Sequence, residues 1–332
     1  AFEEQAAKYL GVKHAIGVNS GTDALVISLA AAGVGKGNEV LTTPFTFFAT
    51  AEAISQVGAE PVFVDIDPVT FNLDVTQAAA KITPRTKAII PVHLFGQAAA
   101  MTPLVELARE NKLLIIEDVA QAFGGEYQGR KLGSIGHLGA FSFFPTKNLG
   151  GLGDGGLIAT NDDNFAERAL MLRAHGSKIK YCNEMLGYNS RLDELQAAIL
   201  GIKLRYLDSW NEGRRQAAAY YNQLLGQVEN VVVPKEAPHV RHVYHQYTIR
   251  VQKGLRDQVS QRLNQVGIGT MIYYPVPLHR LPVYQHLGCH LPAAEQAAGE
   301  VLSLPIWPLI SRETQLAVGQ EVIRQLGALG TR

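Results

Sequence analysis

The sequence predicts an α/β protein: a mainly parallel sheet of seven strands flanked by helices, followed by a smaller C-terminal α+β domain. In the first 160 residues, short apolar segments alternate with stretches of helical periodicity, the pattern of parallel-sheet proteins. Most of these segments are apolar throughout, as expected of strands that are buried on both faces. A long helical pattern then precedes a second group of strands and helices.

The first half supplies the seven strands of the predicted sheet. They are expected at residues 15–18, 39–42, 61–65, 88–92, 113–117, 140–144 and 156–160. Helical patterns occur at residues 2–10, 22–32 and 101–111. Because ligands of parallel sheets bind at the carboxyl ends of the strands, the polar residues that follow several of these segments are candidates for a binding site.

The second half begins with a helical pattern over residues 192–225, in which Leu195, Ile199 and Ile202 mark one apolar face. A helix of this length is suited to linking two domains. After it, strands are expected at residues 231–233, 247–251 and 270–274, and helices at residues 255–266 and 313–326. This mixture predicts a small α+β domain.

Two domains follow from this order of elements. Residues 1–205 are expected to form the large domain and residues 206–332 the small one. The chain begins inside the first helical pattern and carries no initial Met. We therefore expect an N-terminal segment of the large domain to be absent from this sequence.

The composition excludes several classes of protein. Hydrophobic residues make up 47% of the 332 residues and charged residues 18%, so a large core is expected and disorder is not. The 30 basic and 30 acidic residues balance, which gives no sign of a nucleic-acid-binding surface. No apolar run approaches the roughly 20 residues that span a bilayer, so no membrane contact is expected. Two cysteines, Cys182 and Cys289, cannot form a disulfide framework and indicate a reducing, cytoplasmic location.

Residues 19–23, Asn-Ser-Gly-Thr-Asp, follow an expected strand and open an expected helix. Free amide groups at a helix start, with glycine allowing a close approach of the backbone, can bind an anion such as phosphate. The same residues also suit an ordinary helix cap, formed by Ser20 or Thr22. The motif alone leaves both interpretations open.

Two further polar groups follow apolar strands. Glu117 and Asp118 end one strand, where one of them could cap the next helix, or a buried carboxylate could pair with a protonated pyridine nitrogen. Lys147 follows another strand and a proline turn, and precedes a glycine-rich stretch. Most lysines extend to the surface. A partly buried one would have a lowered pKa and would act as a nucleophile toward carbonyl groups.

Other candidate motifs lead to no site. The glycine-rich residues 150–156 precede a strand, whereas a dinucleotide-binding loop follows a strand and opens a helix, and residues 33–37 fail in the same way. Two groups of histidines and a cysteine lack the spacing of zinc ligands, so no metal is predicted. They are His239, His242 and His245, and His286, Cys289 and His290.

Seven short motifs are spread over essentially the whole chain. They are SGTDAL at residues 20–25, PFTFFAT at 44–50, PVFVD at 61–65, EDVAQ at 117–121, SFFPTKN at 142–148, GDGG at 153–156 and GYNSRLDELQ at 187–196. In this order they resemble the DegT/DnrJ/EryC1/StrS sugar aminotransferases. The resemblance implies a fold-type I pyridoxal-phosphate enzyme that is typically a homodimer.

The resemblance assigns the cofactor chemistry to four residues. Lys147 would bind the aldehyde of pyridoxal 5′-phosphate as a Schiff base and move protons, and Asp118 would pair with the pyridine nitrogen and keep the ring protonated. Gln121 would contact the ring hydroxyl, and Phe47 would stack on the ring. Phe123 departs from the family, because many members carry histidine there, which puts a polar contact near the cofactor in doubt.

The same resemblance implies how the phosphate is held. Gly21, Thr22 and Ser142 would bind the phosphate group within one subunit. Asn189 would reach the phosphate in the neighbouring subunit. The predicted active sites are therefore shared between the two chains of a homodimer.

The substrate prediction rests on one motif. Residues 187–198 resemble the form found in members that aminate C3 of deoxythymidine-diphosphate (dTDP) 6-deoxyhexoses, so a dTDP-3-keto-6-deoxyhexose is expected. A nucleotide diphosphate needs cationic or donor groups, and tyrosines can pack against a sugar or base. The candidate contacts, each of which could equally be an ordinary surface or core residue, are Lys178, Tyr181, Arg191, Tyr274 and His279.

The implied reaction has two halves. Glutamate, the expected donor, would convert the cofactor to its pyridoxamine 5′-phosphate form, which would then aminate the keto-sugar. Amination of a 4-keto-sugar or of a cyclitol stays open as an alternative. A sugar dehydratase is disfavoured, because those relatives carry histidine where this chain has Lys147. A non-catalytic pyridoxal-phosphate sensor is disfavoured because Lys147, Asp118 and Gln121 are all present.

Overall fold

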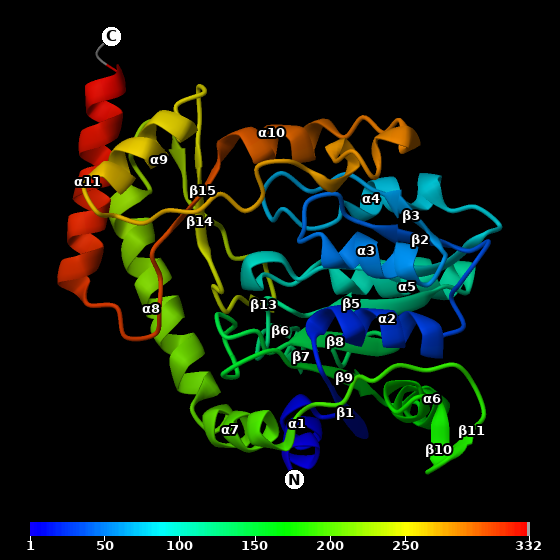
Figure 1. Ribbon diagram of the computed structural model, residues 1–332. Coiled ribbons are helices and arrows are strands. Elements are labelled where there is room, and N and C mark those ends of the chain that lie inside the picture. Colours follow the sequence, from blue (N-terminus) through cyan, green and yellow to red (C-terminus); the bar gives the residue numbers. More distant parts are fainter. Residues whose placement is uncertain (331–332) are drawn as a thin grey trace.

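A seven-stranded sheet forms the centre of the computed structural model, which describes residues 1–330 (Figure 1). Its strand order is β1-β9-β8-β5-β4-β2-β3. The strands are β1 (His14–Val18), β2 (Glu39–Thr42), β3 (Glu60–Phe63), β4 (Thr86–Ile90), β5 (Leu114–Asp118), β8 (Leu138–Ser142) and β9 (Gly156–Thr160). Only β9 runs antiparallel to its neighbours in this sheet, β1 and β8. The predicted mainly parallel sheet is confirmed, with strand limits displaced by up to two residues.

Helices cover both faces of this sheet. The helices of one face are α2 (Gly21–Ala31), α3 (Ala49–Gln56) and α6 (Asp163–Arg173), and those of the other face are α1 (Phe2–Leu10), α4 (Val75–Ala78), α5 (Met101–Asn111) and α7 (Glu194–Leu204). Successive strand residues point to opposite faces, so Ile115 packs with α5 while Ile116 packs with α2. This is why these strands are apolar throughout.

The predicted long helix over residues 192–225 is two helices. It divides at Arg205 and Tyr206 into α7 and α8 (Leu207–Leu225). Leu204 and Leu207, on either side of the division, are buried in the same apolar cluster. The hydrophobic periodicity therefore continues across the junction, which explains why the sequence pattern shows one helix.

A second, antiparallel sheet lies in the C-terminal part, as the predicted α+β fold requires (Figure 1). Its strand order is β12-β14-β15, and α8, α9 and α11 pack around it. These elements are β12 (Val231–Val232), β14 (Tyr247–Val251), β15 (Val301–Leu304), α9 (Arg256–Gln265) and α11 (Arg312–Gly330).

The predicted strand at residues 270–274 is wrong. Met271 forms only an isolated bridge to Ser303, in β15, and it is β15 that pairs with β14. Tyr273 and Tyr274 instead pack against an apolar cluster that contains Phe45 of the first half of the chain. Their aromatic character reflects burial between two parts of the molecule and not a place in a sheet.

Segments beyond residue 206 also return to the large sheet. β13 (Val240–Arg241) pairs with β6 (Glu126–Tyr127), which in turn pairs with β7 (Arg130–Lys131). The Asp65 carboxylate, at the end of β3, accepts hydrogen bonds from the Ala293 and Ala294 N–H groups in the first turn of α10 (Pro292–Glu300) at 2.9 Å. The division into residues 1–205 and 206–332, of which 331–332 lie outside the described residues, stays a prediction.

Two sequence-level observations have a structural counterpart. Cys182 and Cys289 are both free thiols. Across residues 1–330, no helix has the length and apolar character needed to cross a membrane.

Glu117 is a fully buried carboxylate on the central strand β5. Its oxygens accept hydrogen bonds from the N–H groups of Gly133, Ile135 and Gly136 at 2.6–2.8 Å, and lie 2.9 Å from His93 Nε2. His93 Nδ1 accepts from the Ala99 N–H, so Nε2 carries the proton and donates to Glu117. Burial by itself would raise the pKa of Glu117, but the donors His93, Gly136 and Gly133 hold it below its ordinary value.

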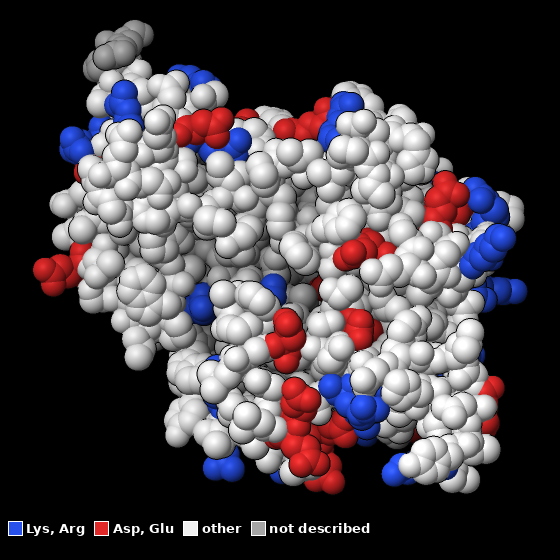
Figure 2. Space-filling view, in the orientation of Figure 1, with Lys and Arg blue, Asp and Glu red and all other residues white. Residues whose placement is uncertain are grey.

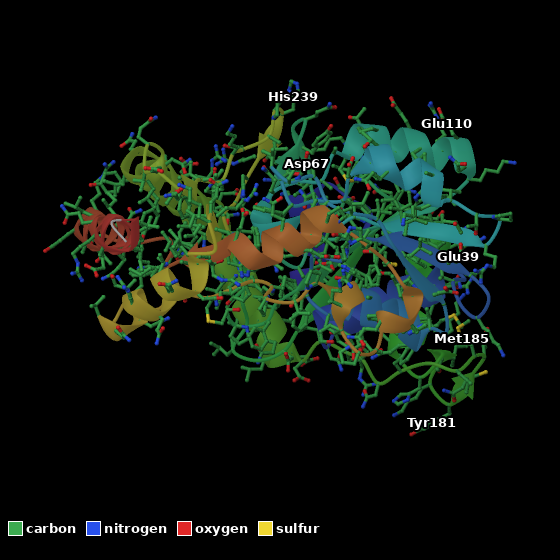
Figure 3. The ribbon with its side chains drawn as sticks, turned by 90° about the horizontal axis from the view of Figure 1, so that it is seen from above. Glu39, Asp67, Glu110, Tyr181, Met185 and His239 are labelled. Carbon is green, nitrogen blue, oxygen red and sulfur yellow. The ribbon has the colours of Figure 1, made fainter. Side chains whose placement is uncertain are left out.

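We expect Glu117→Gln to lower the free energy of unfolding by about 3 kcal/mol, because the amide group leaves at least one buried N–H donor without an acceptor. Since the folded-state pKa of Glu117 is lowered, this contribution is present above its ordinary pKa and is lost as the pH falls through the lowered value. Chemical denaturation at neutral pH measures the difference. Glu110→Gln, an exposed change on α5 (Figure 3), is the control, and equal stabilities of the two variants would contradict the expectation.

Candidate active site

The start of helix α2 lies against the end of strand β8. Ser20 caps the helix by accepting a hydrogen bond from the Asp23 N–H at 3.1 Å, which settles the choice between Ser20 and Thr22 as the capping residue. A Cβ atom at Gly21 would lie 2.6 Å from the Ser142 Cβ, so only glycine allows this close approach. The predicted phosphate-binding residues of one subunit thus meet at a helix N-terminus, where backbone N–H groups attract an anion.

Asp118 ends β5 with its carboxylate buried. It accepts hydrogen bonds from the Thr50 hydroxyl at 2.9 Å and from the Ala120 N–H at 3.1 Å. Burial raises the pKa of Asp118, against the opposing effects of these two donors and of the Lys147 charge. A carboxylate with so little solvation is stabilised by a nearby cationic donor, and a protonated pyridine nitrogen would supply one.

Lys147 lies in a turn beyond β8, where its N–H donates to the Phe144 carbonyl at 2.8 Å. Burial lowers the pKa of Lys147 to about 8, while the charge of Asp118 opposes this shift. At neutral pH more of the Lys147 amine is therefore unprotonated than in an ordinary lysine, and the unprotonated amine is the form that attacks carbonyl carbon. The surface interpretation of this lysine does not hold.

Gln121 is hydrogen-bonded to Tyr274, whose ring lies beside that of Phe47. The Gln121 side-chain oxygen accepts from the Phe95 N–H at 2.8 Å, and its amide nitrogen donates to the Tyr274 hydroxyl at 2.9 Å. Because the Phe95 N–H can only donate, the orientation of the Gln121 amide is determined. The Phe47 side chain is 60% exposed, and its ring centroid lies 6.4 Å from that of Tyr274.

These groups fit a flat, charged cofactor that carries a phosphate. The start of α2 offers an anion site beside Ser142, Phe47 offers an exposed ring face, and Asp118 offers a buried anion with Lys147 close enough to influence its pKa. Figure 2 shows the face of the molecule hollowed between the C-terminal part and the part built on the large sheet, with mostly uncharged walls.

Four predicted residues lie on an exposed segment. Lys178, Tyr181, Asn189 and Arg191 are all exposed, and the first two belong to the hairpin of β10 (Ser177–Ile179) and β11 (Cys182–Asn183) or its turn. Lys178 forms an ion pair with Glu167. The hairpin lies at the end of the molecule away from α8 and α11 (Figure 1), and Tyr181 lies at the periphery in Figure 3. Asn189 and Arg191 instead flank Ser190, whose hydroxyl donates to Asn19 Oδ1 at 3.2 Å, just before α2.

His279 and Phe123 are buried. His279 Nε2 lies 3.0 Å from the Glu295 carboxylate, and the Glu295 carboxylate also accepts from Arg280. Phe123 packs in the apolar cluster beneath the sheet, with its ring 5.0 Å from that of Phe141. The Phe123 side chain is thus part of the core, and the loss of a polar contact to the cofactor at this position stays a prediction.

Several residues of the site carried no role in the sequence analysis. Thr50 ends the motif PFTFFAT and Asn148 ends the motif SFFPTKN, so membership of these motifs could have indicated a role for both residues. His245 and Asn211 hydrogen-bond to Asn148 from distant parts of the chain, and no local pattern indicates this. Among the described residues, no three His, Cys, Asp or Glu side chains form a group that could hold a metal ion.

Two relatives match almost the whole chain. A Geobacillus stearothermophilus protein named pleiotropic regulatory protein is 53% identical over 325 residues, which cover 96% of this chain and 87% of the relative. An Acidithiobacillus ferrooxidans protein named UDP-N-acetyl-3-dehydro-α-D-glucosamine 3-aminotransferase is 46% identical over 326 residues, covering 98% and 87%.

A solved structure and a family model agree with these relatives. The crystal structure of DesV from S. venezuelae, in complex with a ketimine intermediate, matches with a TM-score of 0.94 and 45% identity, covering 97% of this chain and 87% of DesV. The model of the DegT/DnrJ/EryC1/StrS aminotransferase family matches residues 1–323. The chain therefore belongs to the DegT/DnrJ/EryC1/StrS family of pyridoxal-phosphate-dependent aminotransferases.

Proposed function

We propose that this aminotransferase moves an amino group from glutamate to C3 of a dTDP-linked 3-keto-6-deoxyhexose. The observation that carries the proposal is the Lys147 amine, with its pKa lowered to about 8 by burial, under the influence of the buried Asp118 carboxylate. The name of the Acidithiobacillus relative, a 3-aminotransferase of a nucleotide sugar, supports amination at C3. The form of residues 187–198 supports the 6-deoxyhexose.

Pyridoxal phosphate supplies an aldehyde that accepts an amino group and a ring that withdraws electrons. Lys147 would carry the cofactor and, once released from it, would hold and move the proton at its own Nζ. Asp118 would bind the ring nitrogen, with Thr50 and Ala120 orienting its two oxygens. Gln121 has one amide hydrogen left after its bond to Tyr274, and this hydrogen would bind the ring hydroxyl.

The remaining predicted contacts complete the binding of cofactor and substrate. Gly21, Thr22 and Ser142 would hold the phosphate at the start of α2, and the exposed face of Phe47 would cover the ring. Tyr274, whose ring lies beside that of Phe47, would face the sugar from the same wall. The exclusion of water by these aromatic side chains would strengthen the charge interactions of Lys147 and Asp118.

We expect Lys147→Ala to lower kcat by at least about 10³-fold, because both the covalent attachment and the proton transfer are lost. Borohydride reduction of the wild-type protein with pyridoxal phosphate, followed by peptide mapping, should locate the cofactor on Lys147. In cofactor-free protein, the attachment rate should rise with pH through about 8, as the amine loses its proton. Lys36→Ala, an exposed lysine before β2, is the control. A stable adduct on another lysine would disprove the assignment.

The substrate is tested with a panel of nucleotide keto-sugars and glutamate as donor. The expected product carries nitrogen at C3 of a dTDP-6-deoxyhexose, as determined by NMR. Amination of a UDP-linked sugar at C3 would change the nucleotide of the proposed substrate but keep the position of amination. Nitrogen at C4, or turnover of a cyclitol ketone alone, would replace the proposed substrate by one of the two alternatives.

The proposed enzyme is a homodimer with shared active sites. Helix α7 buries Leu200 and Leu204 in its own chain, but its opposite side carries Leu195 and Ile202, which are 70% and 59% exposed. Such an apolar helix face is typical of a subunit interface. The exposed Asn189 precedes this helix by a few residues, and we propose that it reaches the cofactor phosphate of a partner packed on α7.

Mixing inactive Lys147→Ala chains with inactive Asn189→Ala chains should restore activity, to about a quarter of the wild-type level. This value follows because half of the randomly formed dimers are hybrids and each hybrid has one complete site. A mixture of Lys147→Ala and Asp118→Asn chains is the control, since both proposed roles belong to the same subunit's site. No recovery in the first mixture, or equal recovery in both, would contradict a shared site.

A further inference from the structure

A directional chain of hydrogen bonds starts at the residue next to Lys147. Asn148 Nδ2 donates to Asn211 Oδ1 at 2.7 Å and to the Val243 carbonyl at 3.1 Å, and Asn148 Oδ1 lies 3.0 Å from His245 Nδ1. Asn211 Nδ2 donates in turn to the Phe123 carbonyl at 3.0 Å. The three side chains are all buried.

The two carbonyl groups determine every orientation in this chain. A carbonyl oxygen only accepts, so the atom of Asn148 that faces Val243 must be nitrogen, and the atom of Asn211 that faces Phe123 must be nitrogen too. The Asn148 oxygen then faces His245. Because that oxygen can only accept, the His245 Nδ1 atom must carry a hydrogen and donate it.

His245 carries no charge in this position. Burial and the charges of Lys147 and Arg214 hold the pKa of His245 well below its ordinary value. Arg214, on α8, donates to the backbone carbonyls of Tyr244 and His245 at 3.2 and 3.1 Å and so fixes the backbone of this segment. The imidazole is therefore a neutral, backbone-anchored Nδ1–H donor to Asn148.

This network joins the segment that contains Gln121 to the segment that contains Lys147. The Phe123 carbonyl lies two residues beyond Gln121, and Asn148 directly follows Lys147. The network thus connects the turn of Lys147 to the turn that follows Asp118, through α8 and residues 243–245. Since a small displacement of a reacting group has a large effect on rate, the relative position of these two turns matters for the reaction.

We propose that His245 is a positioning residue for Lys147, which it holds in place by donating its Nδ1 hydrogen to the side chain of Asn148. The inference rests on the proposed role of Lys147. His245 is not assigned a contact with the substrate or the cofactor, so its effect passes through the Asn148 amide. Of the three histidines His239, His242 and His245, it is His245 that contacts Asn148.

A pair of variants separates this role from a general packing role. In His245→Asn the side-chain Nδ2 is bonded to Cγ, as the imidazole Nδ1 is in histidine, so an N–H donor to Asn148 is kept. In His245→Leu, a side chain with the same branching as Asn, the donor is lost. Both variants lack Nε2, so the difference between them reports the Nδ1 hydrogen alone.

We expect His245→Leu to lower kcat by roughly 10-fold to 100-fold, with KM for glutamate changed by less than about 3-fold. His245→Asn should stay within about 3-fold of the wild type. In the pH titration of the absorbance of the Lys147-bound cofactor, the midpoint should move in His245→Leu and return in His245→Asn. His239→Asn, a change of an exposed histidine in the same segment, is the control for the substitution.

Equal losses in the two His245 variants, or no loss in either, would overturn the proposal. If His245→Leu does not fold, His245→Asn still decides, because a 10-fold or larger loss of kcat in that variant contradicts a role through the Nδ1 hydrogen. Borohydride trapping of the cofactor in the wild type distinguishes a failure of the proposed function from a failure of the proposed role of His245. Without trapping on Lys147 the proposed function fails, whereas trapping with unchanged variants rejects only the role of His245.

Discussion

Two consecutive acids on the central strand β5 impose the main constraint on this structure. Glu117 and Asp118 point to opposite faces of the sheet, and both are buried. A buried carboxylate is stable only if donors surround it. Among residues 1–330, Glu117 obtains four donors from His93 and the turn before β8, while Asp118 obtains two, from Thr50 and Ala120. The acceptor positions of Glu117 are occupied by donors of its own chain, whereas Asp118 can still accept a hydrogen bond from a cationic ligand.

The arrangement of the site follows from this asymmetry. The donors to Glu117 belong to residues 133–136, directly before β8, so they position the strand that leads to Ser142 and Lys147. The close contact at Gly21 then brings the start of α2 against the same strand. The acid on one side of β5 that is bonded within the chain and the acid on the other side that keeps acceptor capacity are thus connected through β8.

The C-terminal part of the chain contributes hydrogen bonds to the motifs of the large sheet. Tyr274 hydrogen-bonds Gln121, His245 hydrogen-bonds Asn148, and the Asp65 carboxylate caps α10. Each contact joins a residue after position 206 to a motif of the large sheet. The site is therefore built from both ends of the chain, and its precision depends on their packing.

The sequence by itself determined the parallel sheet, because strands buried on both faces are apolar at every position. It also indicated Lys147 and Asp118, since each follows such a strand at the edge where ligands bind. It did not reveal the break between α7 and α8, the strand β15, or the partners of Asn148. Local periodicity reports that a residue is buried, but not which distant residue buries it. Only the tertiary structure decided that Tyr274 lies beside Gln121 and that the apolar face of α7 is left uncovered by its own chain.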